Sequence, residues 1–172
     1  SESAIALEAP ENYDWEAVFD QATWFHITGI TPAISESAAA ASLMAVQAAK
    51  QCGLTVSCDL NFRKKLWNWN PDVPPVDLAR DTMHGLMPYI DVVDANEEAA
   101  DLALGIGASR TDVESSELNV AGYTDVARKI VEKYNSVKRV AITLRESISA
   151  SHNNWGEMLY DSVNDQAYFA QL

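Results

Sequence analysis

The most informative stretch of the chain is residues 54–67, Leu54-Thr55-Val56-Ser57-Cys58-Asp59-Leu60-Asn61-Phe62-Arg63-Lys64-Lys65-Leu66-Trp67. The stretch begins as a short apolar, β-branched run, which is typical of a buried strand. It ends in charged and amide groups that a core would not tolerate unpaired. Asp59, Asn61 and Arg63 are spaced by two, so they point to the same side while the chain stays extended. Because ligands of α/β proteins bind at the carboxyl ends of strands, the stretch is either one wall of a site or an ordinary polar loop in which Arg63 pairs with an acid.

Composition and charge restrict the possible partners. The 172 residues are 48% hydrophobic, which suits a single domain with a sizeable core. The formal net charge of −13 argues against a nucleic-acid partner, because phosphate backbones are bound through clustered Lys and Arg. Arg63, Lys64 and Lys65, with Arg80 further on, form a basic island in this acidic chain. The island favours a small anionic ligand, and chance clustering on a solvated face is the alternative.

The two cysteines, Cys52 and Cys58, suit neither a disulfide framework nor a metal site. Both lie in apolar segments, and we expect them to pack as small hydrophobes in a reducing compartment. We find no signal-peptide pattern and no apolar run of membrane-spanning length. The sequence therefore predicts a cytoplasmic protein with no membrane partner.

Strand-like and helical segments alternate four times along the chain. This alternation predicts an α/β fold in which a mostly parallel sheet is connected by right-handed crossovers and has helices on both faces. A C-terminal antiparallel hairpin around residues 163–165 is expected to close a single domain of residues 1–172. We expect strands at 24–30, 54–60, 89–95 and 137–144, and helices at 15–22, 35–51, 76–87, 97–104 and 120–134.

Three of the expected strands end in polar clusters, which a parallel sheet would bring to one edge and so to one groove. Helix N-termini and Arg side chains at such an edge suit a phosphorylated nucleotide. Glu97 and Glu98 could hold a hydrated magnesium ion, although acids in a first helical turn are favoured by the helix dipole alone. Thr143 could equally be a strand residue with no role. The clusters are Asp59, Asn61 and Arg63; Asn96, Glu97 and Glu98; and Thr143, Leu144, Arg145, Glu146 and Ser147.

Several common catalytic motifs are absent from the sequence. There is no Gly-rich phosphate loop of the Walker or dinucleotide type and no Gly-x-Ser-x-Gly elbow. The histidines, His26, His84 and His152, are scattered singly, and each is expected to be structural. No general base is evident.

Four runs of the sequence resemble the ribokinase-like (PfkB) carbohydrate kinases, and within that family they are most similar to the 2-keto-3-deoxygluconate kinases. The resemblance covers nearly the whole chain, in order and with fitting spacing. It implies a ribokinase-like three-layer fold, a carbohydrate kinase activity, and ATP and Mg²⁺ as cofactors. The runs are residues 24–33 (WFHITGITPA), 58–67 (CDLNFRKKLW), 95–98 (ANEE) and 140–147 (VAITLRES).

The resemblance also implies roles for the polar clusters. Arg63 would meet the carboxylate of the sugar acid and lie near the ATP phosphates, with Asn61 beside it. Asn96 would lie near the phosphates, and Glu98 near the hydrated metal ion. The nucleotide site would be lined by Thr143, Arg145, Glu146 and Ser147.

One position departs from the family pattern. The Asn-x-x-Glu motif of the family has an acid three residues after the Asn, where this chain has Ala99. Glu98 or Asp101 could compensate. In the nucleotide stretch, Arg145 stands where many relatives carry Gly, which suits the sugar-acid branch.

The resemblance further implies that the chain is a partial domain. The N-terminal Gly-Gly sugar-binding motif and most of the lid of the family have no counterpart, nor has the C-terminal Gly-Ala-Gly-Asp-type motif with the catalytic Asp. We therefore expect no catalytic residue in the segment, which alone would be inactive. The parent protein would phosphorylate 2-keto-3-deoxygluconate with ATP. The alternatives are a truncated, non-catalytic domain that binds a nucleotide or a partner, or a kinase for a different sugar; a homo-oligomer is possible.

Overall fold

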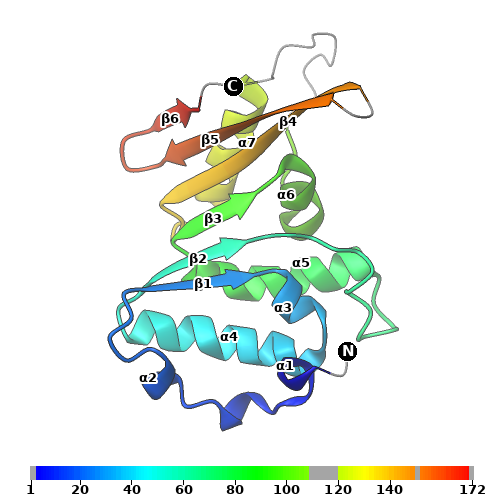
Figure 1. Ribbon diagram of the computed structural model, residues 1–172, viewed down its shortest axis with the longest axis vertical. Helices are drawn as coiled ribbons and strands as arrows, with labels where there is room; N and C mark the ends of the chain where they lie inside the picture. The colour runs from blue at the N-terminus through cyan, green and yellow to red at the C-terminus, as the bar shows by residue number, and fades with distance from the viewer. Residues whose placement is uncertain (1–2, 109–119, 150–151, 171–172) are drawn as a thin grey trace.

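A six-stranded sheet runs through the computed structural model, which describes residues 3–108, 120–149 and 152–170. The strands lie side by side in chain order, and β1 to β4 are parallel, whereas β5 and β6 are antiparallel to their neighbours (Figure 1). The α/β fold and the closing hairpin are thereby confirmed. The strands are β1 (Trp24–Thr28), β2 (Thr55–Asp59), β3 (Val92–Ala95), β4 (Arg139–Ser149), β5 (His152–Asp161) and β6 (Gln166–Phe169).

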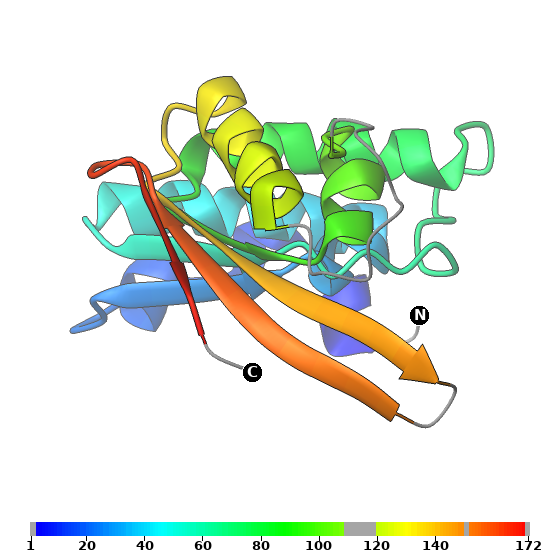
Figure 2. The same ribbon diagram turned by 90° about the horizontal axis from the view of Figure 1, so that it is seen from above.

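The longer helices all lie on one face of the sheet (Figure 2). Because β1 to β4 follow one another across the sheet in a single direction, right-handed crossovers place every connecting helix on the same side. Of the three layers expected, the described residues form the sheet and one helical layer. The longer helices are α4 (Glu36–Gln51), α5 (Pro75–Leu86), α6 (Glu97–Leu104) and α7 (Val120–Lys133). The short elements are α1 (Ala4–Leu7), η1 (Pro10–Asn12), α2 (Trp15–Val18), α3 (Ile30–Ala33) and η2 (Met87–Tyr89).

Helix ends follow the local signals in the sequence. Ser35 Oγ accepts a hydrogen bond from the Ala38 N–H at 3.0 Å, and so caps α4. Gly53, with φ of 79°, follows that helix in the left-handed region. Two details differ from expectation: the helix expected at 15–22 ends at Val18, and the strand expected at 24–30 ends at Thr28, with a helical turn, α3, beginning at Ile30. Pro is tolerated there, since the N–H groups of a first turn have no partner within the helix.

The apolar core fills the space between the sheet and these helices. Val56, Cys58, Val93 and Ile142 are fully buried on the helical side. The expectation that both cysteines are buried holds for Cys58 only, because Cys52 lies exposed where α4 ends.

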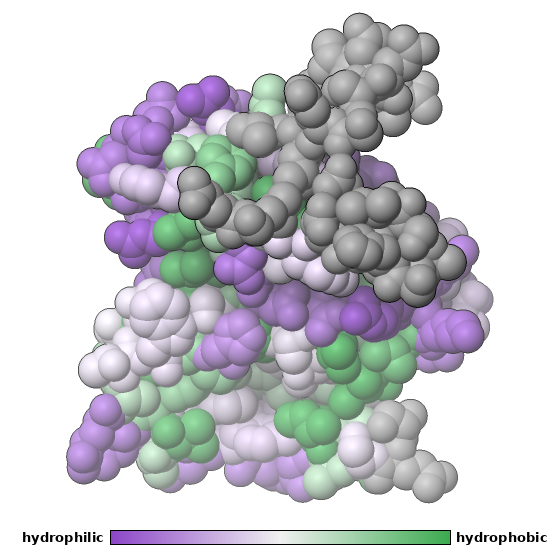
Figure 3. Space-filling view, turned by 45° about the horizontal axis from the view of Figure 1, so that its top comes forward, coloured by the Kyte–Doolittle hydropathy of each residue, from purple (hydrophilic) through white to green (hydrophobic). Residues whose placement is uncertain are grey.

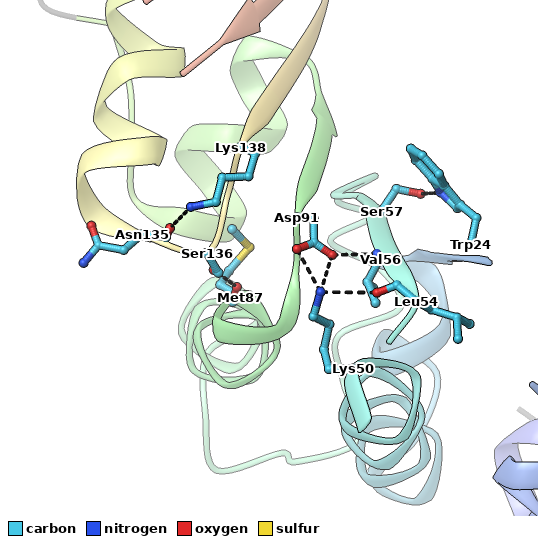
Figure 4. Close-up of polar contacts among 10 residues, drawn as sticks. All are labelled: Trp24, Lys50, Leu54, Val56, Ser57, Met87, Asp91, Asn135, Ser136 and Lys138. Carbon is cyan, nitrogen blue, oxygen red and sulfur yellow. Dashed lines mark hydrogen bonds and ion pairs between the residues drawn. The ribbon is translucent and has the colours of Figure 1, made fainter. Parts of the chain in front are cut away.

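The opposite side of the sheet, which we call the open face, carries the alternate set of strand residues. On it, the Trp24 indole N–H donates to Ser57 Oγ at 2.8 Å (Figure 4). Hydrophilic and hydrophobic side chains are mixed on the side of the molecule seen in Figure 3. The open face comprises Trp24, His26, Ser57, Asp59, Asp94, Thr143, Glu157 and Leu159. Within the described ranges, no helix is both long and apolar enough to span a bilayer.

An ion pair joins α4 to the sheet at the end opposite the polar clusters (Figure 4). Lys50 Nζ donates to both carboxylate oxygens of Asp91, at 2.9 and 2.6 Å, and to the Leu54 carbonyl at 3.2 Å. The same carboxylate accepts the backbone N–H of Val56 at 2.8 Å. Asp91 therefore links the helix end, β2 and the start of β3.

Replacing this carboxylate should destabilise the fold. We expect Asp91→Ala to lower the free energy of unfolding by about 2 kcal/mol, since the change removes charge-assisted hydrogen bonds and leaves the Val56 N–H unpaired. Urea unfolding measures the difference, with the exposed Asp20→Ala as the matched control. Equal midpoints for the two variants would contradict this role.

Candidate functional site

The polar end of β2 turns sharply instead of continuing as a strand. β2 ends at Asp59, and Asn61 has φ of 34°, with its backbone N–H donating to Asp59 Oδ1 at 3.1 Å. The extended geometry that would align Asp59, Asn61 and Arg63 on one side is therefore lost. The turn instead carries Arg63 across the end of the sheet toward α6.

Backbone contacts from both neighbouring strands hold this turn. The Gly29 N–H, after β1, donates to the Asp59 carbonyl at 2.8 Å, and the Leu60 N–H donates to the Asp94 carbonyl of β3 at 2.9 Å. A Cβ on Gly29 would lie 2.1 Å from the Leu60 carbonyl oxygen. The close approach requires glycine and fixes where the chain leaves the sheet.

A pocket of about 430 Å³, the cationic compartment, lies between this turn and the start of α6. Arg63 is exposed there, and its guanidinium donates to the Phe62 carbonyl at 3.1 Å. Among the described residues Arg63 forms no ion pair, so the alternative of a polar loop with Arg63 paired to an acid is not supported. The compartment is lined by Phe62, Arg63, Lys64, Val76, Asn96, Glu98, Ala99 and Leu102.

A second pocket of about 280 Å³, the aromatic compartment, adjoins the first. Its lining shares Asn96 and Glu98 with the cationic compartment, so the two form one groove along the carboxyl ends of β2, β3 and β4. Burial and nearby Glu97 raise the pKa of Tyr123, which keeps its hydroxyl protonated. The aromatic compartment is lined by Asn96, Glu97, Glu98, Tyr123, Thr143 and Trp155.

The structure thus places Arg63, Asn96, Glu98 and Thr143 along this groove. Asn61 forms the turn but lines neither compartment. The backbone of Arg145, Glu146 and Ser147 belongs to β4, and their side chains lie outside the part of the structure that is described.

Two aromatic residues that line the groove, Tyr123 and Trp155, were not predicted as site residues from the sequence. Tyr123 fits the apolar stripe of the 120–134 helix, and Trp155 lies in a hairpin strand without a motif. Neither carries a local signal, because only the packing of α7 and β5 beside the end of β4 brings them together.

Glu98 and Asp101, the two acids that could compensate for Ala99, point in different directions from α6. Ala99 is buried, and its N–H donates to Asn96 Oδ1 at 2.7 Å, so Asn96 caps the helix. Asp101 turns away toward α5, where its carboxylate lies 3.9 Å from Arg80 Nη2. Glu98 faces the groove. The described residues hold no group of three or more His, Cys, Asp or Glu side chains that could bind a metal ion.

Carboxylates also gather on the open face beside the groove. Asp94 pairs in register with Asp59. Burial, followed by the charges of Asp59 and Glu157, raises the pKa of Asp94, against smaller opposing effects of His26 and of a backbone hydrogen bond. The Cys58 thiol below them has its pKa raised to about 12, mainly by burial, so it is no nucleophile.

The raised pKa of Asp94 predicts a pH dependence of stability. The folded chain holds this proton more tightly than the unfolded chain, so the free energy of unfolding falls as the pH rises from 3.8 through the raised pKa. Asp94→Asn should therefore be more stable than the wild type at pH 7 and lose that advantage near pH 3. Urea unfolding at both pH values tests this, with exposed Asp72→Asn as control. A less stable variant at pH 7 would contradict the prediction.

The chain is similar to carbohydrate kinases of known structure. Over 99% of its length the chain matches the crystal structure of a 2-dehydro-3-deoxygluconokinase from Thermotoga maritima, with 38% sequence identity and a TM-score of 0.82. The chain has the fold of the PfkB carbohydrate kinases. A PfkB family carbohydrate kinase from Listeria grayi, 22% identical, matches 96% of the chain with a TM-score of 0.73 and supports this fold.

A curated relative carries a related name. A 2-dehydro-3-deoxygalactonokinase from Haloferax volcanii is 36% identical over 97 residues, which are 56% of this chain and 28% of that protein. The chain spans 47% of the Thermotoga structure and 45% of the Listeria structure. No protein-family model matches the sequence. The resemblance to PfkB carbohydrate kinases is thereby confirmed, with the chain corresponding to about half of each matched structure.

Proposed function

We propose that the protein containing this chain transfers the γ-phosphoryl group of ATP to a 2-keto-3-deoxy sugar acid. The observation that carries the proposal is the 38% identity to the Thermotoga 2-dehydro-3-deoxygluconokinase across 99% of the chain. The groove at the strand ends supports it, because the groove joins a cationic compartment to one that exposes aromatic rings. The residues described form one wall of that site.

Arg63 is proposed to bind the substrate carboxylate. The gluconate and galactonate derivatives in the names of the two relatives share a carboxylate and a 2-keto group. An Arg side chain that is exposed in a pocket and forms no described ion pair can give a carboxylate two parallel hydrogen bonds. Asn61 supports the turn that presents Arg63.

The phosphates are proposed to lie near the N-terminus of α6. Asn96 caps this helix and lines both compartments, and Thr143 also lines the aromatic compartment. Glu98 would contact a hydrated Mg²⁺, which when bound neutralises phosphate charge. Arg145, Glu146 and Ser147 continue β4 beyond Thr143 and are proposed as further nucleotide-binding residues.

A substrate panel tests the proposed reaction. The full-length protein is assayed for ADP formation with 2-keto-3-deoxygluconate, 2-keto-3-deoxygalactonate, fructose and ribose. We expect a kcat/KM for one of the sugar acids that exceeds those for both neutral sugars by about 100-fold, given the contribution of a paired charge. Turnover of a neutral sugar at an equal rate would overturn the sugar-acid assignment in favour of a kinase for a different sugar.

A second candidate is a non-catalytic nucleotide-binding domain. The buried Ala99, at the acid position of the family motif, favours it. In that case calorimetry would detect ATP binding by the full-length protein, and the substrate panel would show no turnover of any sugar. An Ala99→Glu variant that gained turnover would locate the defect at this position.

A further inference from the structure

We propose that Trp69 is a positioning residue for Arg63, because its indole ties the loop that carries Arg63 to the helical turn α3. The inference rests on the proposed function, since Arg63 is the residue proposed to bind the substrate carboxylate. It gives a role to a Trp that lines neither compartment of the groove.

The loop that follows β2 is attached at two points to one short segment, residues 29–32. At its start, the Gly29 N–H donates to the Asp59 carbonyl at 2.8 Å. Further along, the Trp69 indole N–H donates to the Pro32 carbonyl at 3.2 Å. Pro32 is buried in α3, which begins directly after Gly29. The loop and α3 leave the sheet at the same edge (Figure 1), so one packed segment holds both attachments.

Core packing strengthens the second attachment. Trp67 is 1% exposed, and Leu66 and Trp69 pack against the apolar core. The Leu66 N–H donates to the Arg63 carbonyl at 2.9 Å, which closes a turn directly before Trp67. The Trp67 indole N–H is buried without a hydrogen-bond partner among the described residues, so of the two indoles it is Trp69 that bonds to α3.

The Arg63 side chain has little of its own to fix it. Its guanidinium donates to the carbonyl of the adjacent Phe62 and forms no ion pair within the described ranges. Its direction in the cationic compartment therefore depends on where the backbone of the turn lies. Two parallel hydrogen bonds to a carboxylate need defined distances and angles, so a displaced turn would weaken them.

Trp69→Phe in the full-length protein tests this positioning, because Phe keeps an aromatic ring in the core and removes the hydrogen bond to Pro32. We expect the KM for the sugar acid to rise about fivefold, while kcat and the Kd for ATP change less than about twofold. In an Arg63→Ala background, Trp69→Phe should change kcat/KM less than about twofold, since residues that act through one another are not additive. The matched control is Trp24→Phe, which removes the indole hydrogen bond to Ser57 on the open face and should leave the KM unchanged.

Hydrogen exchange provides a readout that does not depend on turnover. The amides of residues 60–68 should exchange about fivefold faster in Trp69→Phe than in the wild type, with the rates elsewhere in the sheet and helices unchanged.

The two measurements separate this inference from the proposed reaction. An unchanged KM in folded Trp69→Phe would overturn the inference, as would an equal KM effect in the Arg63→Ala background or faster exchange throughout the sheet. Faster exchange confined to the loop, without phosphorylation of any sugar acid, would uphold the anchoring of Arg63 by Trp69 and refute the proposed reaction.

Discussion

Arg63→Ala should reduce kcat/KM for the sugar acid by about 100-fold or more while leaving the Kd for ATP within about threefold. The guanidinium lines the cationic compartment and forms no ion pair within the described residues. Its removal therefore deletes the group proposed to bind the substrate carboxylate without breaking a described salt bridge. Steady-state kinetics on the full-length protein, with ATP binding measured separately, give the two quantities.

The controls are Arg63→Lys and Lys65→Ala. Lysine keeps the charge but not the planar fork, so we expect it to recover only part of the loss. Lys65 is an exposed neighbour that lines neither compartment, and its removal should change kcat/KM less than threefold. A loss of ATP binding as large as the loss of sugar-acid turnover would contradict carboxylate recognition by Arg63.

Gly29→Ala should strongly destabilise the fold, because the added methyl group would meet backbone. The new Cβ would lie 2.1 Å from the Leu60 carbonyl oxygen, which belongs to backbone and cannot move alone. The Gly29 N–H also bonds the Asp59 carbonyl, so separating the two segments breaks that bond and displaces the turn toward Arg63. We expect a loss of about 3 kcal/mol or more in the free energy of unfolding.

Gly85→Ala is the matched control. Gly85 lies in α5, and a Cβ there meets nothing within 4 Å. Alanine is the better helix former, so this variant should gain about 0.5–1 kcal/mol. Chemical denaturation of both variants measures the two differences, which we expect to have opposite signs. Equal stability of Gly29→Ala and the wild type would contradict the close approach of Gly29 to the Leu60 carbonyl group.

Local features of this chain were predictable from the sequence because their causes lie within a few residues. Ser35 and Asn96 cap helices through the N–H group three residues later, and Gly53 and Gly105 follow helices with positive φ. Short apolar, β-branched runs likewise form strands because of the residues within the run itself. The α/β class followed from their alternation with helices.

Features that depend on distant contacts were not predictable in the same way. The strand order places the crossover helices together, and no local pattern specifies that order. Tyr123 and Trp155 meet Asn96 only through the packing of α7 and β5. Asn61 is an intermediate case, because Asn tolerates left-handed backbone more readily than most residues and could have marked the turn.

Binding of the substrate carboxylate by Arg63 can be observed in a complex of the protein with a sugar acid. The measurement is a crystal structure of the full-length protein with a 2-keto-3-deoxy sugar acid and a non-hydrolysable ATP analogue. We expect guanidinium nitrogens of Arg63 about 3 Å from the substrate carboxylate, with the phosphates beside Asn96. A carboxylate bound by other groups, with Arg63 directed into solvent, would contradict it.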